Sequence, residues 1–265
     1  MINKEVKAEI LRRLELAEME HDVKIILAVE SGSRAWGFES SNSDYDARFI
    51  YVNKPEWYLS VGLEEKRDVI EYPIVDDLDI NGWDLRKALR LYWKSNPALM
   101  EWVQSPIIYS ESTSFKSSIL NLVPDVYSVE SGIYHYRSMA KNNFRGYLKN
   151  EFVPLKKYFY VLRPLLSVRW LEKYNKPAPI EFNKLLHLIS EHEVLLKAID
   201  NLLIQKRSSL ELGVLPQIPE IHNFIESELE RIESISPQHF EKKNVESNLS
   251  ETFRIVLRET WSESL

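Results

Sequence analysis

Three stretches of patterned hydrophobicity open the chain, and they predict a helix followed by two strands. Residues 5–20 carry apolar side chains at helical spacing, which predicts an amphipathic helix: Val6, Ile10, Leu14 and Ala17. Residues 24–30 form an apolar run with β-branched side chains, the pattern of a buried strand. Residues 44–52 alternate between two kinds of side chain, which predicts a second strand with unlike faces.

The second predicted strand separates charge from core. One face is charged and carries Asp44, Asp46 and Arg48. The other face is suited to a core and carries Tyr45, Ala47, Phe49 and Tyr51. Two carboxylates on one strand face repel each other unless a cation compensates them. An Asp-x-Asp pair alone is nevertheless common, and it usually marks a solvated strand end.

A Gly-Ser pair between the two strands favours a more specific interpretation. Gly32 and Ser33 directly follow the first predicted strand. Glycine lets the backbone approach a ligand closely, and exposed N–H groups in such a turn bind phosphate oxygens. Mg²⁺ takes carboxylate and phosphate oxygens, and paired ions stabilise both the attacking and the leaving oxygen in phosphoryl transfer. Together with Asp44 and Asp46, the pair predicts Mg²⁺-dependent attack on the α-phosphate of a nucleotide.

These motifs resemble a known family. Gly32-Ser33 followed by Asp44-x-Asp46 resembles the signature of the polymerase-β-like nucleotidyltransferase superfamily. Longer strings resemble its bacterial and phage branch of predicted nucleotidyltransferases assigned to RNA repair, at residues 32–51, 79–87 and 160–166. The resemblance implies an α+β or α/β fold, in which a catalytic domain with a mixed sheet precedes an α-helical C-terminal domain.

The resemblance also implies a third carboxylate on a later strand, beside the first two. We expect Asp79 to supply it, because Asp79 lies between apolar neighbours after a strand pattern at residues 67–75. Asp44, Asp46 and Asp79 are thus the expected catalytic residues and metal ligands, for two Mg²⁺ ions or for Mn²⁺. In the family mechanism the third acid also helps to activate the attacking hydroxyl. The competing acids are Glu71, Asp76, Asp77 and Asp84.

Asp84 has a structural explanation of its own. It directly precedes the helical pattern of residues 85–94, where an aspartate caps the helix N-terminus. We expect Gly82 to supply the turn between Asp79 and this helix.

The expected nucleotide contacts come from both halves of the chain. The motif supplies Gly32, Ser33, Arg34 and Ser43. By resemblance, the helical part closes over the nucleotide, so Lys157 or Lys156 and Arg163 are candidates too. Arg163 precedes Pro164 within a helical pattern, and the hydrogen bond lost at proline predicts a kink that turns Arg163 toward the site.

Charge is distributed unevenly along the chain. The net charge of the 265 residues is −6, which argues against general affinity for nucleic acid. Between Arg137 and Lys176, however, ten basic residues face only Glu151 and Glu172, which leaves +8. Tyrosine and tryptophan side chains are interleaved with these charges, so this stretch predicts a surface for RNA or for the triphosphate. The alternative is a solvated helical face whose aromatic side chains point into the core.

Composition and later patterns set the domain organisation. The sequence has no cysteine and no apolar run near the roughly 18 residues of a membrane span, and it begins without an apolar signal region, so we expect a cytoplasmic protein without membrane contact. We expect a catalytic domain over residues 1–118 and a helical domain over 119–265. Further strand signals lie at 107–109, and helical patterns at 98–103, 134–150, 156–174, 182–203, 219–234 and one ending near Trp261.

The sequence therefore predicts a nucleotidyltransferase that moves a nucleoside monophosphate from an NTP, such as ATP, to an acceptor hydroxyl. The expected acceptor is an RNA end, with tRNA as one example, and the expected leaving group is pyrophosphate. An RNA-repair protein is a candidate partner. Two alternatives stay open: the same chemistry on a protein or small molecule, and a nucleotide sensor without catalysis.

Overall fold

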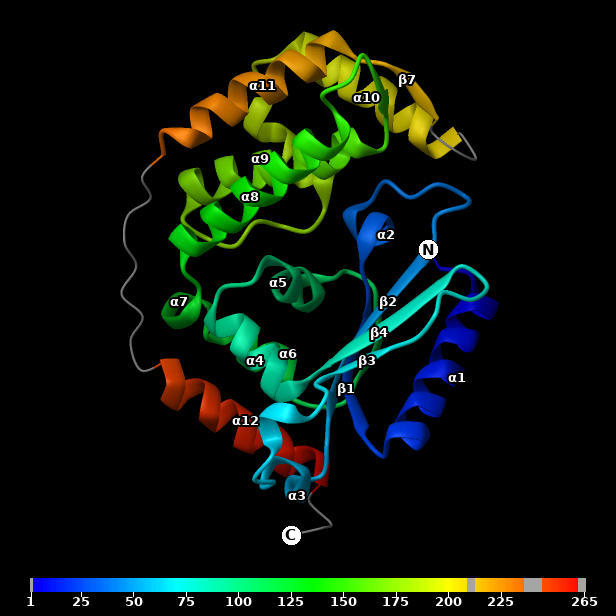
Figure 1. Cartoon of the computed structure of the whole chain (residues 1–265), viewed down its shortest axis with the longest axis vertical. Helices are drawn as coiled ribbons and strands as arrows, with labels where there is room; N and C mark the ends of the chain where they lie inside the picture. The colour runs from blue at the N-terminus through cyan, green and yellow to red at the C-terminus, as the bar shows by residue number, and fades with distance from the viewer. Residues whose placement is uncertain (1, 209–212, 236–244, 262–265) are drawn as a thin grey trace.

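A five-stranded sheet forms the centre of the molecule (Figure 1). The computed structural model describes residues 2–208, 213–235 and 245–261. The strands lie in the order β3-β4-β2-β1-β5, with β2 and β4 parallel and the other neighbours antiparallel. The predicted mixed sheet and α+β class are therefore confirmed. The strands are β1 (Lys24–Glu30), β2 (Tyr45–Val52), β3 (Val69–Glu71), β4 (Leu78–Asp84) and β5 (Ile108–Glu111).

The helix α1 (Lys4–His21) covers one face of this sheet, as predicted from its apolar spacing. Its buried residues Ile10 and Leu14 belong to the same apolar cluster as Phe49 and Tyr51 of β2. The apolar face of β2 is thus core, as its alternation predicts. The charged face of β2 consequently lies on the opposite side of the sheet.

The opposite face of the sheet joins a larger core. Ile50 and Val52 of β2 share this core with residues of three helices: α4 (Leu85–Trp93), α5 (Pro97–Gln104) and α6 (Phe115–Asn121). Asp84 caps α4 as predicted, since its carboxylate accepts a hydrogen bond of 2.8 Å from the backbone N–H of Arg86. Gly82 is not a turn residue, however. It lies within β4, where a Cβ atom would come within 2.4 Å of the Phe49 ring.

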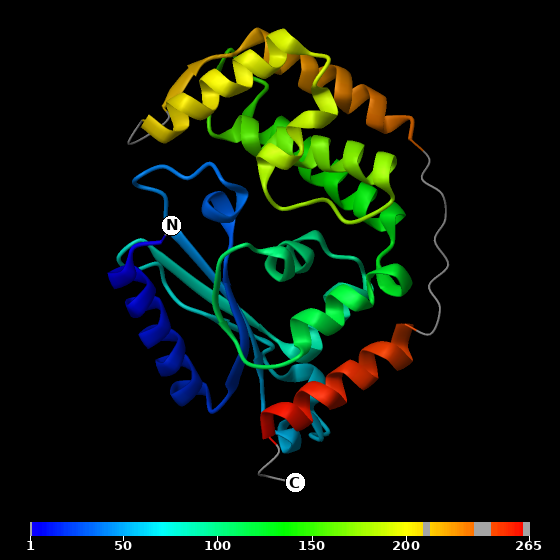
Figure 2. The same cartoon turned by 180° about the vertical axis from the view of Figure 1, so that it is seen from behind.

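The second half of the chain is mostly helical, and Figures 1 and 2 show its helices between residues 129 and 233 gathered at one end of the molecule. No helix in the described ranges is apolar over a length that would cross a membrane. Pro164 lies inside α9, and the helix continues through it. The helices of this half are α7 (Val123–Val126), α8 (Val129–Tyr147), α9 (Lys157–Tyr174), α10 (Glu193–Ser208) and α11 (Pro219–Glu233).

In this half one local prediction was wrong and one small element was not predicted. Residues 182–203 do not form one helix, because two 3₁₀ turns, Phe182–Lys184 and Leu186–Ile189, precede α10. Polar residues 190–192 separate those turns from the helix, so the apolar pattern on either side belongs to different elements. A small antiparallel pair, β6 (Phe152–Pro154) with β7 (Val214–Pro216), was also missed. Its three-residue strands are too short for an alternating pattern to indicate them.

The last helix, α12 (Val245–Trp261), returns to the first half of the chain. The ring of Phe253 meets that of Tyr58, at the end of α3 (Pro55–Tyr58), with 4.9 Å between centroids. The Trp261 indole N–H donates to the Asn53 carbonyl at 3.0 Å. A domain division at residue 118 stays a prediction. By sequence α12 belongs to the expected helical domain, but it packs against residues of the expected catalytic domain.

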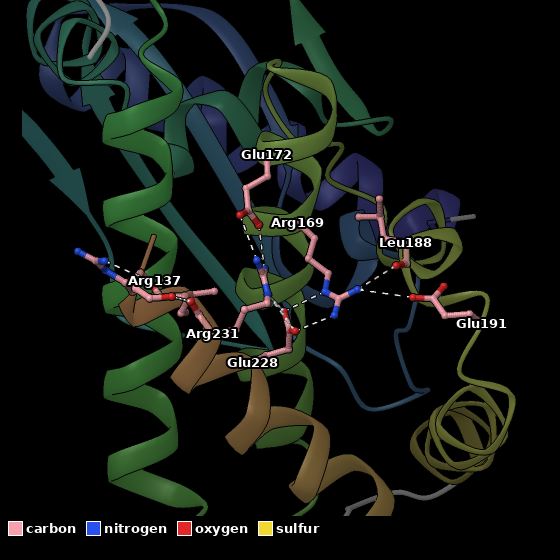
Figure 3. A network of polar contacts seen from close by, with 9 residues as sticks. Arg137, Arg169, Glu172, Leu188, Glu191, Glu228 and Arg231 are labelled. Carbon is pink, nitrogen blue, oxygen red and sulfur yellow. Dashed lines mark hydrogen bonds and ion pairs between the residues drawn. The ribbon is translucent and has the colours of Figure 1, made fainter. Parts of the chain in front are cut away.

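A network of charged side chains joins α9 to α11 (Figure 3). The Arg169 guanidinium donates to both Glu228 carboxylate oxygens, at 2.9 and 2.7 Å. Arg231 donates to Glu228 at 3.1 Å and to both oxygens of Glu172, at 3.0 and 2.8 Å. Glu228 is only 3% exposed. Burial alone would raise its pKa, but the contacts with Arg169 and Arg231 outweigh burial and leave the pKa lowered.

Substituting Glu228 tests this network. Glu228→Gln leaves two guanidinium groups without their shared charge, so we expect the free energy of unfolding to fall by about 2–4 kcal/mol at neutral pH. Because the folded pKa of Glu228 is lowered, its contribution is present above the ordinary carboxyl pKa of about 4.3 and is lost as the pH falls through the folded value. The difference between the two proteins should therefore shrink in acid.

Urea denaturation across this pH range measures the effect. Glu251→Gln is the matched control, because Glu251 pairs with arginines on the exposed surface of α12. An equal loss in both variants, or a difference that grows in acid, would contradict the assigned role of Glu228.

Candidate active site

Gly32 opens a short helix, α2 (Gly32–Trp36), rather than an open turn. Its backbone has φ +57°, which favours glycine, and a Cβ atom there would lie 1.9 Å from Oδ2 of Asp46. The backbone N–H of Ser31 also donates to the Asp46 carbonyl at 2.9 Å. The Gly-Ser pair and the Asp-x-Asp pair are therefore in direct contact, as their proximity in sequence suggests.

The parallel pairing of β2 with β4 places Asp46 directly beside Asp79. The side chains of Asp46 and Asp79 are 26% and 24% exposed, so a ligand can reach both. Asp44 lies just before β2 and is exposed. Asp79 thus occupies the expected position on a strand next to the first two acids. Its role as a third ligand stays a prediction.

The competing acids lie in other surroundings. Glu71 pairs with Arg67 at 2.8 Å, and Asp76 pairs with Arg13 at 2.8 Å. Asp77 is exposed in a turn with φ +59°. Asp84 is buried and caps α4. None of these acids is paired with Asp46 in the sheet, and Asp84, although it lies in the same strand as Asp79, is paired with Tyr51.

Arg48 bridges the two paired aspartates. Its Nη2 donates to Oδ1 of Asp46 at 2.9 Å and to Oδ2 of Asp79 at 2.6 Å, and its Nη1 donates to the Asp79 carbonyl at 2.8 Å. Burial raises the pKa of Asp46, Arg48 lowers it, and the neighbouring charges of Asp79 and Asp44 raise it, with a net increase. Arg48 is therefore the internal cation that limits repulsion between these carboxylates.

Glu30 is a further acid of this site that the sequence interpretation missed. Its side chain is fully buried at the end of β1, where Oε1 accepts the Asp46 backbone N–H at 3.1 Å and Oε2 accepts the Tyr109 hydroxyl. Burial raises the pKa of Glu30 to about 7, although the hydrogen bond from Tyr109 opposes the shift. A charged residue ending an otherwise apolar strand just before Gly32 was the available signal.

Arg34 and Ser43 fix the loop that leads to Asp44. The Arg34 guanidinium donates to the carbonyls of Ser43 at 2.6 Å and Asp44 at 3.3 Å, and it lies 3.7 Å from the centre of the Tyr45 ring. The Ser43 hydroxyl accepts the Ser40 backbone N–H at 2.9 Å. Both predicted nucleotide contacts therefore have structural roles here, and a nucleotide would meet a loop that is already held.

The helical half contributes Lys157 and Tyr160. The Lys157 ammonium lies 4.0 Å from the Tyr147 ring centre and 4.6 Å from that of Tyr160. Burial raises the pKa of Tyr160, and the charges of Asp46 and Asp44 raise it further, so this side chain lies within electrostatic reach of the carboxylates. Tyr160 also packs edge-on against Trp36. Lys157 thus packs between two tyrosine rings, and its contact with a nucleotide stays a prediction.

Arg163 does not reach the site as a free cation. It is 3% exposed and donates to Glu101 Oε1 at 3.0 Å, while its guanidinium lies 4.4 Å from the centre of the Trp36 ring. The expected kink at Pro164 does not turn it outward, because the buried carboxylate of Glu101 holds it inside. Arg163 therefore packs against Trp36, the last residue of α2, and is not free to bind a ligand.

The donor set suits a hard cation. Asp44 and Asp46 offer carboxylate oxygens, which Mg²⁺ and Mn²⁺ prefer over other protein donors. Within the described ranges, no three carboxylate or imidazole side chains are arranged to enclose a metal ion. Arg48 explains this, because it binds one oxygen of Asp46 and one of Asp79. Asp44 and Asp46 thus fit as a pair of ligands, and the Asp79 oxygen that Arg48 binds could join them only by releasing Arg48.

Comparisons with known proteins agree with the motif. The model of the RNA repair pathway DNA polymerase beta family (RlaP) matches residues 6–254, which confirms the resemblance carried by Gly32-Ser33 and Asp44-x-Asp46. The chain is 46% identical over 261 residues to YcgL, an uncharacterised protein of Bacillus subtilis (strain 168), and the match covers 97% of this chain and 99% of that protein.

A structural comparison also returned a nucleotidyltransferase-like protein from Exiguobacterium sibiricum 255-15, at 14% identity and a TM-score of 0.29. That match covers 91% of this chain and 86% of the other. The assignment to a family rests on the family model and on the Bacillus relative.

Replacing Arg48 tests the balance of charge at the site. In Arg48→Met, the carboxylates of Asp46 and Asp79 lose their shared cation, so we expect a loss of about 2 kcal/mol in metal-free buffer. Since the freed oxygens can then bind a cation, added Mg²⁺ should raise the melting temperature more in this variant than in the natural protein.

Thermal unfolding with EDTA and with Mg²⁺ measures both effects. Arg67→Met, which breaks the exposed pair with Glu71, is the control and should show the natural response. An equal Mg²⁺ response in Arg48→Met and the natural protein would contradict the idea that Arg48 competes with a metal for these oxygens.

Proposed function

We propose that this chain, which belongs to the RNA repair pathway DNA polymerase beta family, transfers a nucleoside monophosphate from an NTP to a hydroxyl group at an RNA end, with release of pyrophosphate. The observation that carries the proposal is the pairing of Asp46 with Asp79 across parallel strands, with Gly32 in contact with Asp46. Membership of a polymerase-β-like nucleotidyltransferase family supports a transferase, and the acceptor and the leaving group are parts of the proposal.

The proposed reaction is a single displacement at phosphorus. The acceptor hydroxyl oxygen forms a bond to the α-phosphorus, and the bond from that phosphorus to the bridging oxygen of the β-phosphate breaks. The electron pair of the broken bond leaves with pyrophosphate. The hydroxyl proton passes to the carboxylate of Asp79 and then to solvent. Gly32 contributes by leaving room for the Asp46 carboxylate close to the backbone, because a Cβ atom there would lie 1.9 Å from Oδ2 of Asp46.

Asp44 and Asp46 are the proposed ligands of two Mg²⁺ ions, which Mn²⁺ could replace. When bound, such ions neutralise charge on the phosphates and align the attacking and leaving oxygens. Glu30 and Arg34 keep the two aspartates in place, through the Asp46 N–H and the Asp44 carbonyl respectively. In this proposal the chain supplies a preorganised set of charges, and most of the catalysis comes from alignment and electrostatics.

RNA is the proposed acceptor because of the family description and the remaining basic surface. Several cations of the stretch from Arg137 to Lys176 are used internally, since Lys141 pairs with Glu233, and Arg163 and Arg169 are bound to Glu101 and Glu228. Other cations of the stretch are mostly exposed and form no ion pair within the described residues: Arg145, Lys149, Lys156, Lys157, Lys173 and Lys176. These side chains would bind phosphates of an RNA strand.

One observation favours a second candidate function. Arg48 already binds one oxygen of Asp46 and one of Asp79, so part of their negative charge is compensated without a metal. A protein that binds nucleotides as a sensor, without transfer, would need no more than this arrangement. Transfer to a protein or a small molecule is the same chemistry with another acceptor, and the following experiment separates all three.

The test is transfer of α-phosphate label from each NTP, with Mg²⁺, into total RNA and total protein. We expect label in RNA that nuclease removes. Asp46→Asn and Asp79→Asn should each lower the rate at least about a hundredfold, because each removes charge from the reacting centre. Glu71→Gln is the matched control on the neighbouring strand β3 and should transfer at the natural rate.

Label that protease rather than nuclease removes would assign a protein acceptor. Nucleotide binding without label above the Asp46→Asn background would favour the sensor. Full transfer by Asp46→Asn would contradict the proposed site.

A further inference from the structure

The last residue of α2, Trp36, is held by side chains from two other helices. Its indole N–H donates to Oε2 of Glu101, on α5, at 3.3 Å. The guanidinium of Arg163, on α9, lies 4.4 Å from the centre of its ring. Figures 1 and 2 show α2 and α5 on the side of the first half of the chain that faces α9. Three helices from distant parts of the sequence therefore meet at one side chain.

Glu101 connects these groups through its two carboxylate oxygens. Oε2 accepts the Trp36 N–H, and Oε1 accepts a hydrogen bond of 3.0 Å from Nη1 of Arg163. Glu101 and Arg163 are only 9% and 3% exposed. Separating such a buried pair leaves an uncompensated charge, which is strongly unfavourable. Trp36 and Arg163 are thus linked through one buried carboxylate.

The other end of α2 lies against the proposed metal ligands. A Cβ atom at Gly32 would lie 1.9 Å from Oδ2 of Asp46. Arg34, also in α2, donates to the Asp44 carbonyl at 3.3 Å. The helix has five residues, and at about 1.5 Å of rise per residue its two ends are roughly 6 Å apart. A rotation of α2 at Trp36 would therefore move the groups that contact both aspartates.

We propose that Glu101 is a positioning residue for the transfer reaction. By binding Trp36 and Arg163 together, it holds α2 in the orientation that places Asp44 and Asp46. Under the proposed function, on which this inference rests, these aspartates hold the metal ions. Glu101 acts through Trp36 and is not a catalytic residue. Because Arg163 belongs to the helical half, Glu101 also ties that half of the chain to the Gly-Ser motif.

Apolar packing around α2 is the alternative explanation of its position. The Phe38 ring stacks on that of Phe159 with 4.5 Å between centroids, and Trp36 packs edge-on against Tyr160 at 5.5 Å. Apolar burial is not directional, whereas a hydrogen bond requires the N–H to point at its acceptor. Packing therefore keeps Trp36 inside the protein, and Glu101 fixes the orientation of its ring.

Amide hydrogen exchange of the full chain, followed by mass spectrometry, tests this link without any need for transfer. In Glu101→Gln, one of the two oxygens becomes an amide donor that cannot accept from Trp36 or Arg163. We expect residues 31–46 to exchange at least about tenfold faster than in the natural protein, because local opening becomes easier.

Trp36→Phe is the second variant, and it keeps the test open if Glu101→Gln does not fold. It retains an aromatic ring beside Arg163 and removes the N–H that Glu101 binds. The same residues, 31–46, should exchange faster than in the natural protein, to a smaller extent than in Glu101→Gln.

Glu228→Gln is the matched control. Glu228 is also a buried glutamate bound by an arginine, but it joins α11 to Arg169 of α9. Its substitution should lower stability without selectively faster exchange of residues 31–46. Equal exchange of these residues in Glu101→Gln and the natural protein would overturn the positioning role, as would an equal acceleration in Glu228→Gln.

The transfer assay then measures whether this orientation matters to the reaction. A misplacement of about 1 Å at the reacting groups can lower a rate on the order of a hundredfold, so we expect kcat to fall at least about tenfold in Glu101→Gln and to stay within about twofold in Glu228→Gln. The KM for NTP should change less than kcat, because Glu101 touches no substrate in this proposal.

The two proposals can fail separately. If the natural protein transfers no label, but residues 31–46 exchange faster in Glu101→Gln and Trp36→Phe than in Glu228→Gln, the link from Glu101 to α2 stands and the proposed function fails. If folded Glu101→Gln transfers at the natural rate, the function stands and the positioning role fails.

Discussion

Repulsion among carboxylates at one end of the inner strands β1, β2 and β4 is the constraint on which the rest of this structure depends. Asp46 and Asp79 are held side by side by parallel strands, and Glu30 lies buried directly beneath the backbone of Asp46. Such a concentration of negative charge is unfavourable unless cations are placed within hydrogen-bond distance. Arg48 meets this need from the same strand face as Asp46, and Arg34 meets part of it at Glu30, 3.8 Å away.

The helical half of the chain also makes contacts that support this site. Arg163 of α9 forms a buried pair with Glu101 of α5, and both side chains contact Trp36, the last residue of α2. A charged pair in such surroundings is costly to bury and stabilises only when both partners are satisfied, as they are here. Lys206, near the end of α10, forms no ion pair with a carboxylate among the described residues.

Local pattern was enough to predict some of this arrangement and not the rest. The alternation along residues 44–52 predicted which face of β2 is core, because strand side chains have a fixed period. The choice of Asp79 came from the family resemblance and its apolar neighbours, and only the parallel register places it beside Asp46. Arg163 was misjudged because its partner Glu101 lies 62 residues away. Lys206 could not be found at all, since its contact with Ser40 spans 166 residues.

The basic side chains from the two halves of the chain differ in their partners. Arg48 is bound to Asp46 and Asp79 of the chain itself, so part of their charge is already compensated in the free protein. Lys206 donates to the Ser40 hydroxyl, and neither Lys206 nor Lys156 forms an ion pair among the described residues. A triphosphate would be repelled by Asp44 and Asp46 if it met them alone.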